Sequence, residues 1–310
     1  MKQEWKEFLQ HAGAEFNSDE TCVETFGNPE RERRIIHTGE LFCDLSHFGL
    51  IAAYGEDATE FLQGQFTNDI TEVSSTQSQL SGLCTPKGRM LCNFRIFKRE
   101  DTYYLVIPYE LLEAALDRLR MYVLRSRVTL EDASDALMRM GLNGNKMPGH
   151  LATIIGALPE AVDSCIETDG YTIIRVAGTM PRYEIYGLLE PMKKIWEGVD
   201  VHATAVGADP WELLNIQAGI PVINARSIDA YVPQMANMQL VNGVSFTKGC
   251  YPGQEIVARM HYLGKLKRRM YRIGFDASEK PQTGTALVTE SSVSYTQLRA
   301  HETLGSISYA

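Results

Sequence analysis

The amino-acid sequence predicts an α+β protein built on antiparallel sheets. Helical and strand patterns are interleaved along the 310 residues. The strands fall in hairpins: residues 92–98 and 102–107 flank a short polar turn, and residues 171–176 and 183–186 form a second pair of this kind. Because a hairpin requires antiparallel pairing, we expect this class rather than a doubly wound parallel fold.

Several helices are indicated by their own start and stop signals. Residues 57–60 have a capping-box pattern, so a short helix is expected to follow. Pro108 starts a helix with apolar residues at helical spacing, and residues 190–197 predict another. Asp209 is expected to cap a further helix, with Gly219 just beyond its end.

Composition limits the class of protein and its location. The net charge of −9 argues against general coating of nucleic acid. No apolar run approaches the roughly 20 residues of a membrane span, and the first residues lack the apolar core of a signal peptide. The six cysteines are scattered without a Cys-x-x-Cys pair, so we expect a reducing cytoplasm and no metal site.

Residues 248–255 read Lys-Gly-Cys-Tyr-Pro-Gly-Gln-Glu and are the most informative stretch of the chain. Pro252 suits a first helical turn, so Cys250 is expected near a helix N-terminus with Lys248 beside it. The positive end of the helix and the charge of Lys248 would both favour the thiolate form of Cys250, which makes Cys250 a candidate reactive group. The alternative is a small buried cysteine within an ordinary turn.

This octet resembles the signature of the YgfZ-type folate-binding, tRNA-modifying proteins, which are relatives of the glycine-cleavage T-protein. Residues 61–69 (Phe-Leu-Gln-Gly-Gln-Phe-Thr-Asn-Asp) resemble the first block of that family, and residues 87–90 (Lys-Gly-Arg-Met) the second. Residues 211–223 and 231–234 resemble the third, and the likeness covers residues 40–275. The resemblance implies three subdomains in a ring around a central channel, the last of them a small β-barrel.

The resemblance also implies a division of the chain. Residues 1–35 are expected to form an N-terminal extension, and residues 36–145 a first α+β subdomain. Residues 146–262 would form the second α+β subdomain, which carries the octet. Residues 263–310 are expected to supply only part of the C-terminal barrel. Within them, residues 291–303 do not match the family and are interpreted as an artefact of the reading frame.

A bound tetrahydrofolate or another folate derivative is implied by the family. Trp211 is the expected stacking residue, although a core tryptophan is the alternative. Phe48 stands where the family usually has a tryptophan; it keeps the aromatic face but loses the indole donor. Tyr251 and Gln254 of the octet are further candidates for contact with the folate.

The comparison with the T-protein argues against glycine cleavage. That enzyme activates its folate with an aspartate, whereas residues 87–93 of this chain contain no carboxylate. Without it, aminomethyl transfer loses its obvious general base. Gln217 likewise stands where the T-protein has a glutamate. Folate binding is therefore favoured over this reaction, and whether the chain is an enzyme stays open.

The leading hypothesis is a folate-binding accessory or regulatory protein that supports tRNA modification and the maturation or repair of iron–sulfur enzymes. Its partners would be iron–sulfur or tRNA-modifying enzymes. Cys250 and Lys248 would then act as a reactive pair, unless the octet is a structural clamp that shapes the folate pocket. A folate-dependent one-carbon transferase is the second hypothesis.

A third hypothesis is a module that binds tRNA directly. It rests on a basic strip of lysines and arginines, namely Lys265, Lys267, Arg268, Arg269 and Arg272. The alternative for this strip is a solvated strand face. Another cluster of arginines, between residues 118 and 127, is interpreted as the polar side of a helix end.

Overall fold

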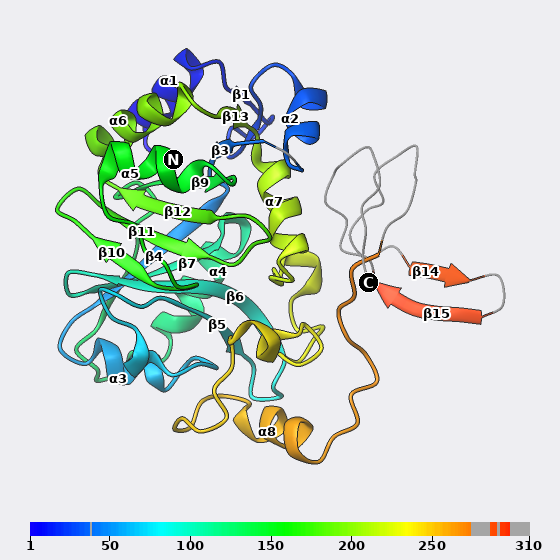
Figure 1. Cartoon of the computed structure of the whole chain (residues 1–310). Coiled ribbons are helices and arrows are strands. Elements are labelled where there is room, and N and C mark those ends of the chain that lie inside the picture. Colours follow the sequence, from blue (N-terminus) through cyan, green and yellow to red (C-terminus); the bar gives the residue numbers. More distant parts are fainter. Residues whose placement is uncertain (38, 274–285, 290–291, 298–310) are drawn as a thin grey trace.

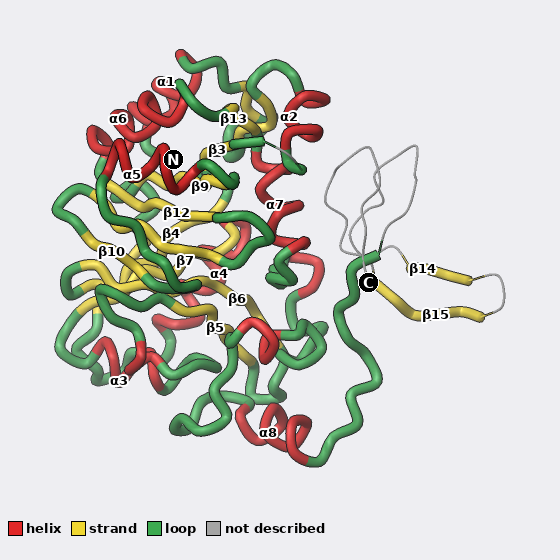
Figure 2. The backbone as a smooth tube through the Cα atoms, in the orientation of Figure 1, coloured by secondary structure: helices red, strands yellow, loops and turns green. Residues whose placement is uncertain are grey.

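Two stacked sheets form the body of the protein. The computed structural model describes residues 1–37, 39–273, 286–289 and 292–297. The upper sheet carries helices on its outer side, and the lower sheet lies between it and the last described helix (Figures 1 and 2). The predicted α+β class is confirmed, and all but one of the strand pairings are antiparallel.

The lower sheet has five strands in the order β5-β6-β7-β4-β8. Its strands are β4 (Phe48–Tyr54), β5 (Gln79–Cys84), β6 (Met90–Arg99), β7 (Thr102–Pro108) and β8 (Thr129–Asp132). The hairpin predicted over residues 92–107 is confirmed, since Arg99 pairs with Thr102 next to the turn. The strand side chains alternate between the inter-sheet face and helix α4 (Tyr109–Arg120), which begins directly after Pro108 as predicted.

The upper sheet has six strands in the order β10-β11-β12-β9-β3-β13. They are β3 (Leu41–Asp44), β9 (Met138–Asn143), β10 (Cys165–Glu167), β11 (Tyr171–Val176), β12 (Arg182–Gly187) and β13 (Thr204–Val206). The second predicted hairpin is confirmed as β11 and β12. Only β13 runs parallel to its neighbour β3, so this sheet is mixed.

The remaining described elements cover these sheets. They are α1 (Gln3–His11), β1 (Glu15–Phe16), β2 (Val23–Thr25), α2 (Pro29–Ile35), α3 (Ala58–Gln63), α5 (Met147–Ile155), α6 (Leu189–Asp200), α7 (Ala208–Gln217) and α8 (Gln254–Tyr262), with short 3₁₀ turns at Ile70–Glu72, Ala225–Ser227 and Met238–Val241. Helices α1, α5 and α6 lie over the upper sheet (Figure 1). Within the described residues, no helix is both long and apolar enough to span a membrane.

Two predicted helix caps differ from the structure. Helix α7 starts at Ala208 with Gly207 at the cap, so Asp209 lies inside the first turn, and its prediction as the cap was wrong. Gly219 does follow the helix in a left-handed conformation (φ +71°), as predicted. Asp57 precedes α3, but its carboxylate accepts hydrogen bonds from Arg127 rather than from the helix.

The N-terminal residues are integrated into the upper half of the molecule. Trp5 and Leu9 of α1 are fully buried, and the Trp5 indole donates to Asp44 Oδ1 at 2.8 Å. The Trp5 ring packs edge-on against Trp196 of α6, with centroids 5.7 Å apart. Residues 1–35, expected to be an extension, therefore supply part of the core.

The expected subdomains share their sheets. Strands β3 and β9, from the segment 36–145, pair directly with each other, and β9 pairs with β12 of the following segment. Conversely, three residues of the expected second segment (Ile223, Met238 and Val257) pack into the core of the lower sheet, whose strands come from the first segment. The chain thus crosses between the two halves, and the boundary expected at 145 does not separate two independent sheets.

The C-terminal part is described only in pieces. After α8, residues 263–273 run as an extended connector (Figure 1). Strands β14 (Ala286–Thr289) and β15 (Ser292–Gln297) then form an antiparallel pair. Among the described residues beyond 262 these two strands form no barrel. The rest of the expected barrel, and the remainder of segment 291–303, lie outside the described residues.

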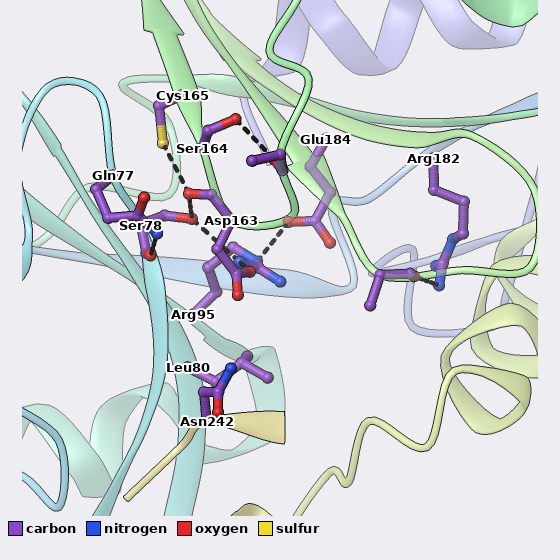
Figure 3. A network of polar contacts seen from close by, with 12 residues as sticks. Gln77, Ser78, Leu80, Arg95, Asp163, Ser164, Cys165, Arg182, Glu184 and Asn242 are labelled. Carbon is purple, nitrogen blue, oxygen red and sulfur yellow. Dashed lines mark hydrogen bonds and ion pairs between the residues drawn. The ribbon is translucent and has the colours of Figure 1, made fainter. Parts of the chain in front are cut away.

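A buried charged network joins the two sheets (Figure 3). The guanidinium of Arg95, on β6, lies 2.5 Å from Asp163 Oδ1 and 3.3 Å from Glu184 Oε2 on β12. It also donates to the Ser78 hydroxyl at 3.1 Å. Burial acts to lower the pKa of Arg95, but the carboxylates of Asp163 and Glu184 outweigh it and raise the pKa. Arg95 therefore stays charged and links the sheets.

Removing this link should destabilise the fold. Arg95→Met leaves two carboxylates without their buried cation, and we expect the free energy of unfolding to fall by about 3–5 kcal/mol. The matched control is Lys98→Met on the same strand, whose ion pair with Asp101 is exposed and contributes about 1 kcal/mol or less. Urea unfolding measures both variants. Equal losses would contradict a structural role for the network.

Candidate functional site

Lys248 is the centre of the octet's contacts. Its ammonium donates to the backbone carbonyls of Gln63 and Phe66, each at 2.6 Å, and to that of Asn68 at 3.0 Å. Gln63 ends helix α3, so its carbonyl belongs to the group that a helix leaves without internal partners. A cation at this end also interacts favourably with the helix dipole. The octet is thereby fastened to the first family block.

The environment of Lys248 fits a clamp. The residue is 8% exposed, and its ammonium lies 5.2 Å from the centre of the Tyr251 ring. Burial lowers the pKa of Lys248 to about 8, and the carboxylate of Asp69 opposes that shift. The protonated form still predominates at neutral pH. Because its donors already face three carbonyls, Lys248 holds the loop rather than activating Cys250 by contact.

The second family block meets the octet backbone to backbone. Gly253 precedes α8 with φ +85°, and a Cβ there would lie 2.4 Å from the carbonyl oxygen of Thr85 and 2.6 Å from the Cα of Gly88. Gly88 has φ +69°, and a Cβ there would lie 2.9 Å from that of Ile256. Only glycine satisfies both the left-handed backbone and this close approach.

The third block completes the junction. The amide of Met90 donates to the carbonyl of Tyr231 at 2.8 Å, and the side chain of Gln234 donates to the carbonyl of Val257 on α8 at 2.6 Å. The Asn68 side chain reaches the carbonyl of Asn242 at 2.6 Å. Four stretches from two distant parts of the sequence therefore converge in one structure, which we call the motif junction (residues 61–69, 85–90, 229–245 and 248–257).

Cys250 lies on the outside of the motif junction. All six cysteines are in the described part of the chain, and Cys250 is the exposed one. Burial raises the pKa of the others: Cys22 and Cys92 to about 12, Cys165 to about 11, and Cys43 and Cys84 also upward. Accessibility therefore separates Cys250 from the rest. The alternative interpretation, in which Cys250 is a small buried cysteine, is therefore wrong for this structure.

The helix that follows Cys250 starts later than predicted. Helix α8 begins at Gln254, after Gly253, so Pro252 lies before the helix and its placement in the first turn was wrong. Tyr251 is buried, and burial raises the pKa of its hydroxyl. The Gln254 side chain lies 3.5 Å from the carbonyl of Lys248, so it stays within the octet loop.

Trp211 and Phe48 form a second, separate group. Trp211 is 0% exposed, with the Arg182 guanidinium carbon 4.1 Å from the centre of its ring and no room for a side chain at Gly141. Phe48 is half-buried against the same core, and its neighbour His47 lies 3.3 Å from Glu212 of α7. The structure thus groups Trp211 with Phe48.

The four expected folate contacts therefore divide into two groups. Trp211 and Phe48 belong to the core between the two sheets, whereas Tyr251 and Gln254 belong to the motif junction. The structure describes Trp211 as a core tryptophan. Its stacking on a folate stays a prediction, as do the contacts of the other three residues.

Sequence reasoning missed the charged residues next to Trp211. Arg182 is fully buried, donates to Asn215 Oδ1 at 2.8 Å, and has a pKa that burial lowers to about 10. Glu184 accepts from the Tyr186 hydroxyl at 2.7 Å. Trp211 Nε1 and Arg182 Nε are buried donors with no partner among the described residues. The available signal was two charges at alternate positions of one strand, Arg182 and Glu184, both facing the inter-sheet side.

Asn93 ends the stretch 87–93, which the sequence resemblance compares with the aspartate-bearing region of the T-protein. Its side-chain amide donates to the carbonyl of Pro221 at 2.7 Å, and its oxygen accepts from the amide of Ile223, also at 2.7 Å. The residue is buried. Both ends of the amide therefore fasten the segment after α7, and an aspartate could not donate to Pro221.

The two basic clusters have different surroundings. Lys265, Lys267, Arg268 and Arg269 are exposed on the connector after α8. In the other cluster, Arg120 donates to the carbonyl of Leu130, and Arg127 pairs with acidic side chains at residues 56 and 57. The second cluster thus serves the end of α4 and the loop that follows it.

Selective alkylation tests the thiol assignment. Under native conditions we expect iodoacetamide to modify one thiol rapidly, and Cys250→Ser to abolish that phase, because burial raises the pKa of the other five thiols and covers four of them. Mass spectrometry of peptides identifies the site. Cys22→Ser is the control, since it removes a half-buried thiol and should leave the fast phase intact. Rapid modification elsewhere would refute the assignment.

Replacing Lys248 tests the clamp. Lys248→Met removes the donor shared by three carbonyls, and we expect a loss of about 3 kcal/mol in the free energy of unfolding. Lys267→Met removes one exposed positive charge and should change stability by about 0.5 kcal/mol or less. Denaturant unfolding compares the two. A Lys248 variant as stable as the control would show that the clamp contributes nothing.

The same variant tests the pKa of Lys248. Its folded value of about 8 lies below the ordinary 10.5, so the folded state binds fewer protons than the unfolded state between these values. The contribution of Lys248 to the free energy of unfolding therefore rises as the pH rises through this window. Unfolding curves across the window should show the rise in the wild type and its absence in Lys248→Met.

Known proteins share both sequence and fold with this chain. The family model described as the GCVT N-terminal domain matches residues 5–163. Among solved structures, the crystal structure of glycine cleavage system aminomethyltransferase T from Bartonella henselae has a TM-score of 0.79, covering 97% of this chain and 84% of that one. At 18% identity this likeness establishes the fold alone.

Closer sequence relatives are proteins named tRNA-modifying protein YgfZ. That of Klebsiella pneumoniae (strain 342) is 31% identical over 243 residues, 78% of this chain and 74% of the relative. That of Yersinia pestis (strain Pestoides F) is 34% identical over 243 residues, which are 78% of this chain and 73% of the relative. That of Colwellia psychrerythraea (strain 34H / ATCC BAA-681) is 32% identical over 228 residues, which are 74% of this chain and 69% of the relative. With the octet and the family match, these relatives show that the chain belongs to the YgfZ family of tRNA-modifying proteins, on a fold similar to the glycine-cleavage T-protein.

Proposed function

We propose that this protein binds a folate and supports tRNA modification as an accessory protein for the maturation or repair of iron–sulfur enzymes. The observation that carries the proposal is the motif junction, which fixes the octet through Lys248 and leaves Cys250 as the exposed thiol. The names of the relatives supply the link to tRNA. Cytoplasmic location is part of the same proposal.

The polar groups beside Trp211 fit the edge of a pterin ring. A pterin presents both donors and acceptors along its edge, and Trp211 Nε1 and Arg182 Nε are two buried donors that lack a partner among the described residues. The Glu184 carboxylate, whose Oε2 also pairs with Arg95 and accepts from the Tyr186 hydroxyl, is an acceptor on the same strand as Arg182. Trp211 has no exposed surface, so edge-on hydrogen bonding fits better here than stacking on an open face. A folate would enter only if the packing around Trp211 shifts.

Asn93 supports binding over aminomethyl transfer. Its amide is used at both ends to hold backbone groups of Pro221 and Ile223, and it offers no base to a folate nitrogen. A folate-dependent one-carbon transferase remains the second candidate function. It would require a general base other than residue 93.

The roles of Lys248 and Cys250 then differ. Cys250 is the group that would contact an iron–sulfur enzyme or its cluster, because thiolates are the ligands such clusters use. Lys248 positions the loop that presents this thiol, through three carbonyls that lie 180 to 185 positions away in sequence. The cluster itself would belong to the client enzyme.

Folate titration tests the proposal. We expect tetrahydrofolate to change the intrinsic tryptophan fluorescence saturably, and Glu184→Gln to weaken binding about tenfold, as expected when a charged hydrogen bond is removed. Cys250→Ser should bind folate normally but fail to restore tRNA modification in cells that lack the protein. No binding by the folded wild type would refute the folate site, and full rescue by Cys250→Ser would refute the role of the thiol.

A further inference from the structure

The connector after α8 is fastened at both ends. At its start, Val257 of α8 is fully buried and its carbonyl accepts from Gln234. At its far end, the amide of Met270 donates to the carbonyl of Met235 at 2.9 Å, and the side chain of Asn237 donates to the carbonyl of Met270 at 2.8 Å. Residues 263–272, which we call the basic strap, are therefore joined to the motif junction through α8 at one end and through Met270 at the other.

The strap carries positive charge that the described protein does not neutralise. No acidic residue stands between Glu255 and Asp276, although the chain as a whole has a net charge of −9. The cations of the strap are Lys265, Lys267, Arg268, Arg269 and Arg272, and all five are exposed. Among the ion pairs formed within the described part of the chain, none includes a strap residue. Their charge is therefore available to a partner.

Flat aromatic rings lie at both ends of these cations. His261 stacks on Phe246 with ring centres 3.7 Å apart and planes 17° apart. Tyr262 stands edge-on to that pair and is 65% exposed. Tyr271, at the other end, is 61% exposed. Exposed rings next to a row of cations are the combination with which proteins bind unpaired bases and their phosphates.

We infer that the basic strap and its aromatic rings bind single-stranded nucleic acid, of the kind displayed by the loops of a folded RNA. The cations would contact phosphates, and Tyr262 and Tyr271 would stack on bases. An anionic membrane fits less well, because the strap is extended and not the amphipathic helix that lies in a lipid interface. The inference adds a direct RNA contact to the proposed function; its tRNA link rests on that proposal, whereas folate binding plays no part in it.

Salt-dependent binding tests the phosphate contacts. Fluorescence anisotropy with labelled bulk tRNA should give an affinity that falls linearly with the logarithm of the KCl concentration. In the variant Lys267→Gln/Arg268→Gln/Arg269→Gln the slope should decrease in magnitude by about 2, at roughly 0.7 for each single-strand phosphate that the variant no longer neutralises. The charge-matched control, Arg31→Gln/Arg118→Gln/Arg125→Gln, should bind as the wild type does. Equal effects of the two variants would overturn the inference.

Stacking needs its own variant. Tyr262→Ser combined with Tyr271→Ser should weaken tRNA binding about tenfold or more without changing the salt slope, because stacking involves no counterion release. A fully paired RNA duplex with the same number of phosphates should bind more weakly than tRNA. Equal binding of duplex and tRNA, or vesicles of phosphatidylglycerol bound in place of tRNA, would overturn the inference. Tetrahydrofolate titration of the same variants should be unchanged, which separates this result from the fate of the folate site.

Discussion

The buried ammonium of Lys248 is the contact on which the rest of the motif junction depends. One side chain supplies donors to three carbonyls in the segment that leaves α3, and it does so from a loop at the other end of the chain. Taking this charge out of water is costly, as its lowered pKa shows, and the three carbonyls offset that cost only in the folded geometry. The clamp therefore forms only when both segments are in place, which makes it a device for fixing their relative position.

Fixing that position has a chemical consequence at Cys250. The same loop that buries Lys248 and Tyr251 turns the intervening thiol outward, while burial covers four other cysteines and raises the pKa of five. The exposure of this one thiol thus follows from the path of the backbone, which is held by Gly253 against Gly88. The polar cluster beside Trp211 lies in the core between the two sheets, apart from the core that receives the motif junction.

The sequence predicts those parts of this structure that depend on the pattern of side chains, and it does not predict those that depend on backbone contacts. The two hairpins and the helix after Pro108 were predictable because side-chain periodicity carries the information. The partners of Lys248 were not, because carbonyl oxygens are the same at every position. The cap of α7 was misplaced by two residues, since the cap residue is Gly207, which has no side chain to signal it. The shared sheets were also beyond reach: pairing of β3 with β9 joins strands about a hundred residues apart, and nothing local specifies it.

The fold itself does not decide between transferase and binding protein, because sites decide function on a shared scaffold. The local structure at Asn93 bears on that choice, because its amide holds the backbone at Pro221 and Ile223 in a way that a carboxylate could not. The segment so held leads from α7 into the motif junction, whose last part runs on through α8 into the basic strap. One continuous stretch, residues 248–272, therefore carries both the exposed thiol and cations that form no ion pair within the described residues, and it is anchored at Lys248, Val257 and Met270. Because these anchors all lie on the motif junction, a partner bound at the strap would lie on the same continuous segment that presents Cys250.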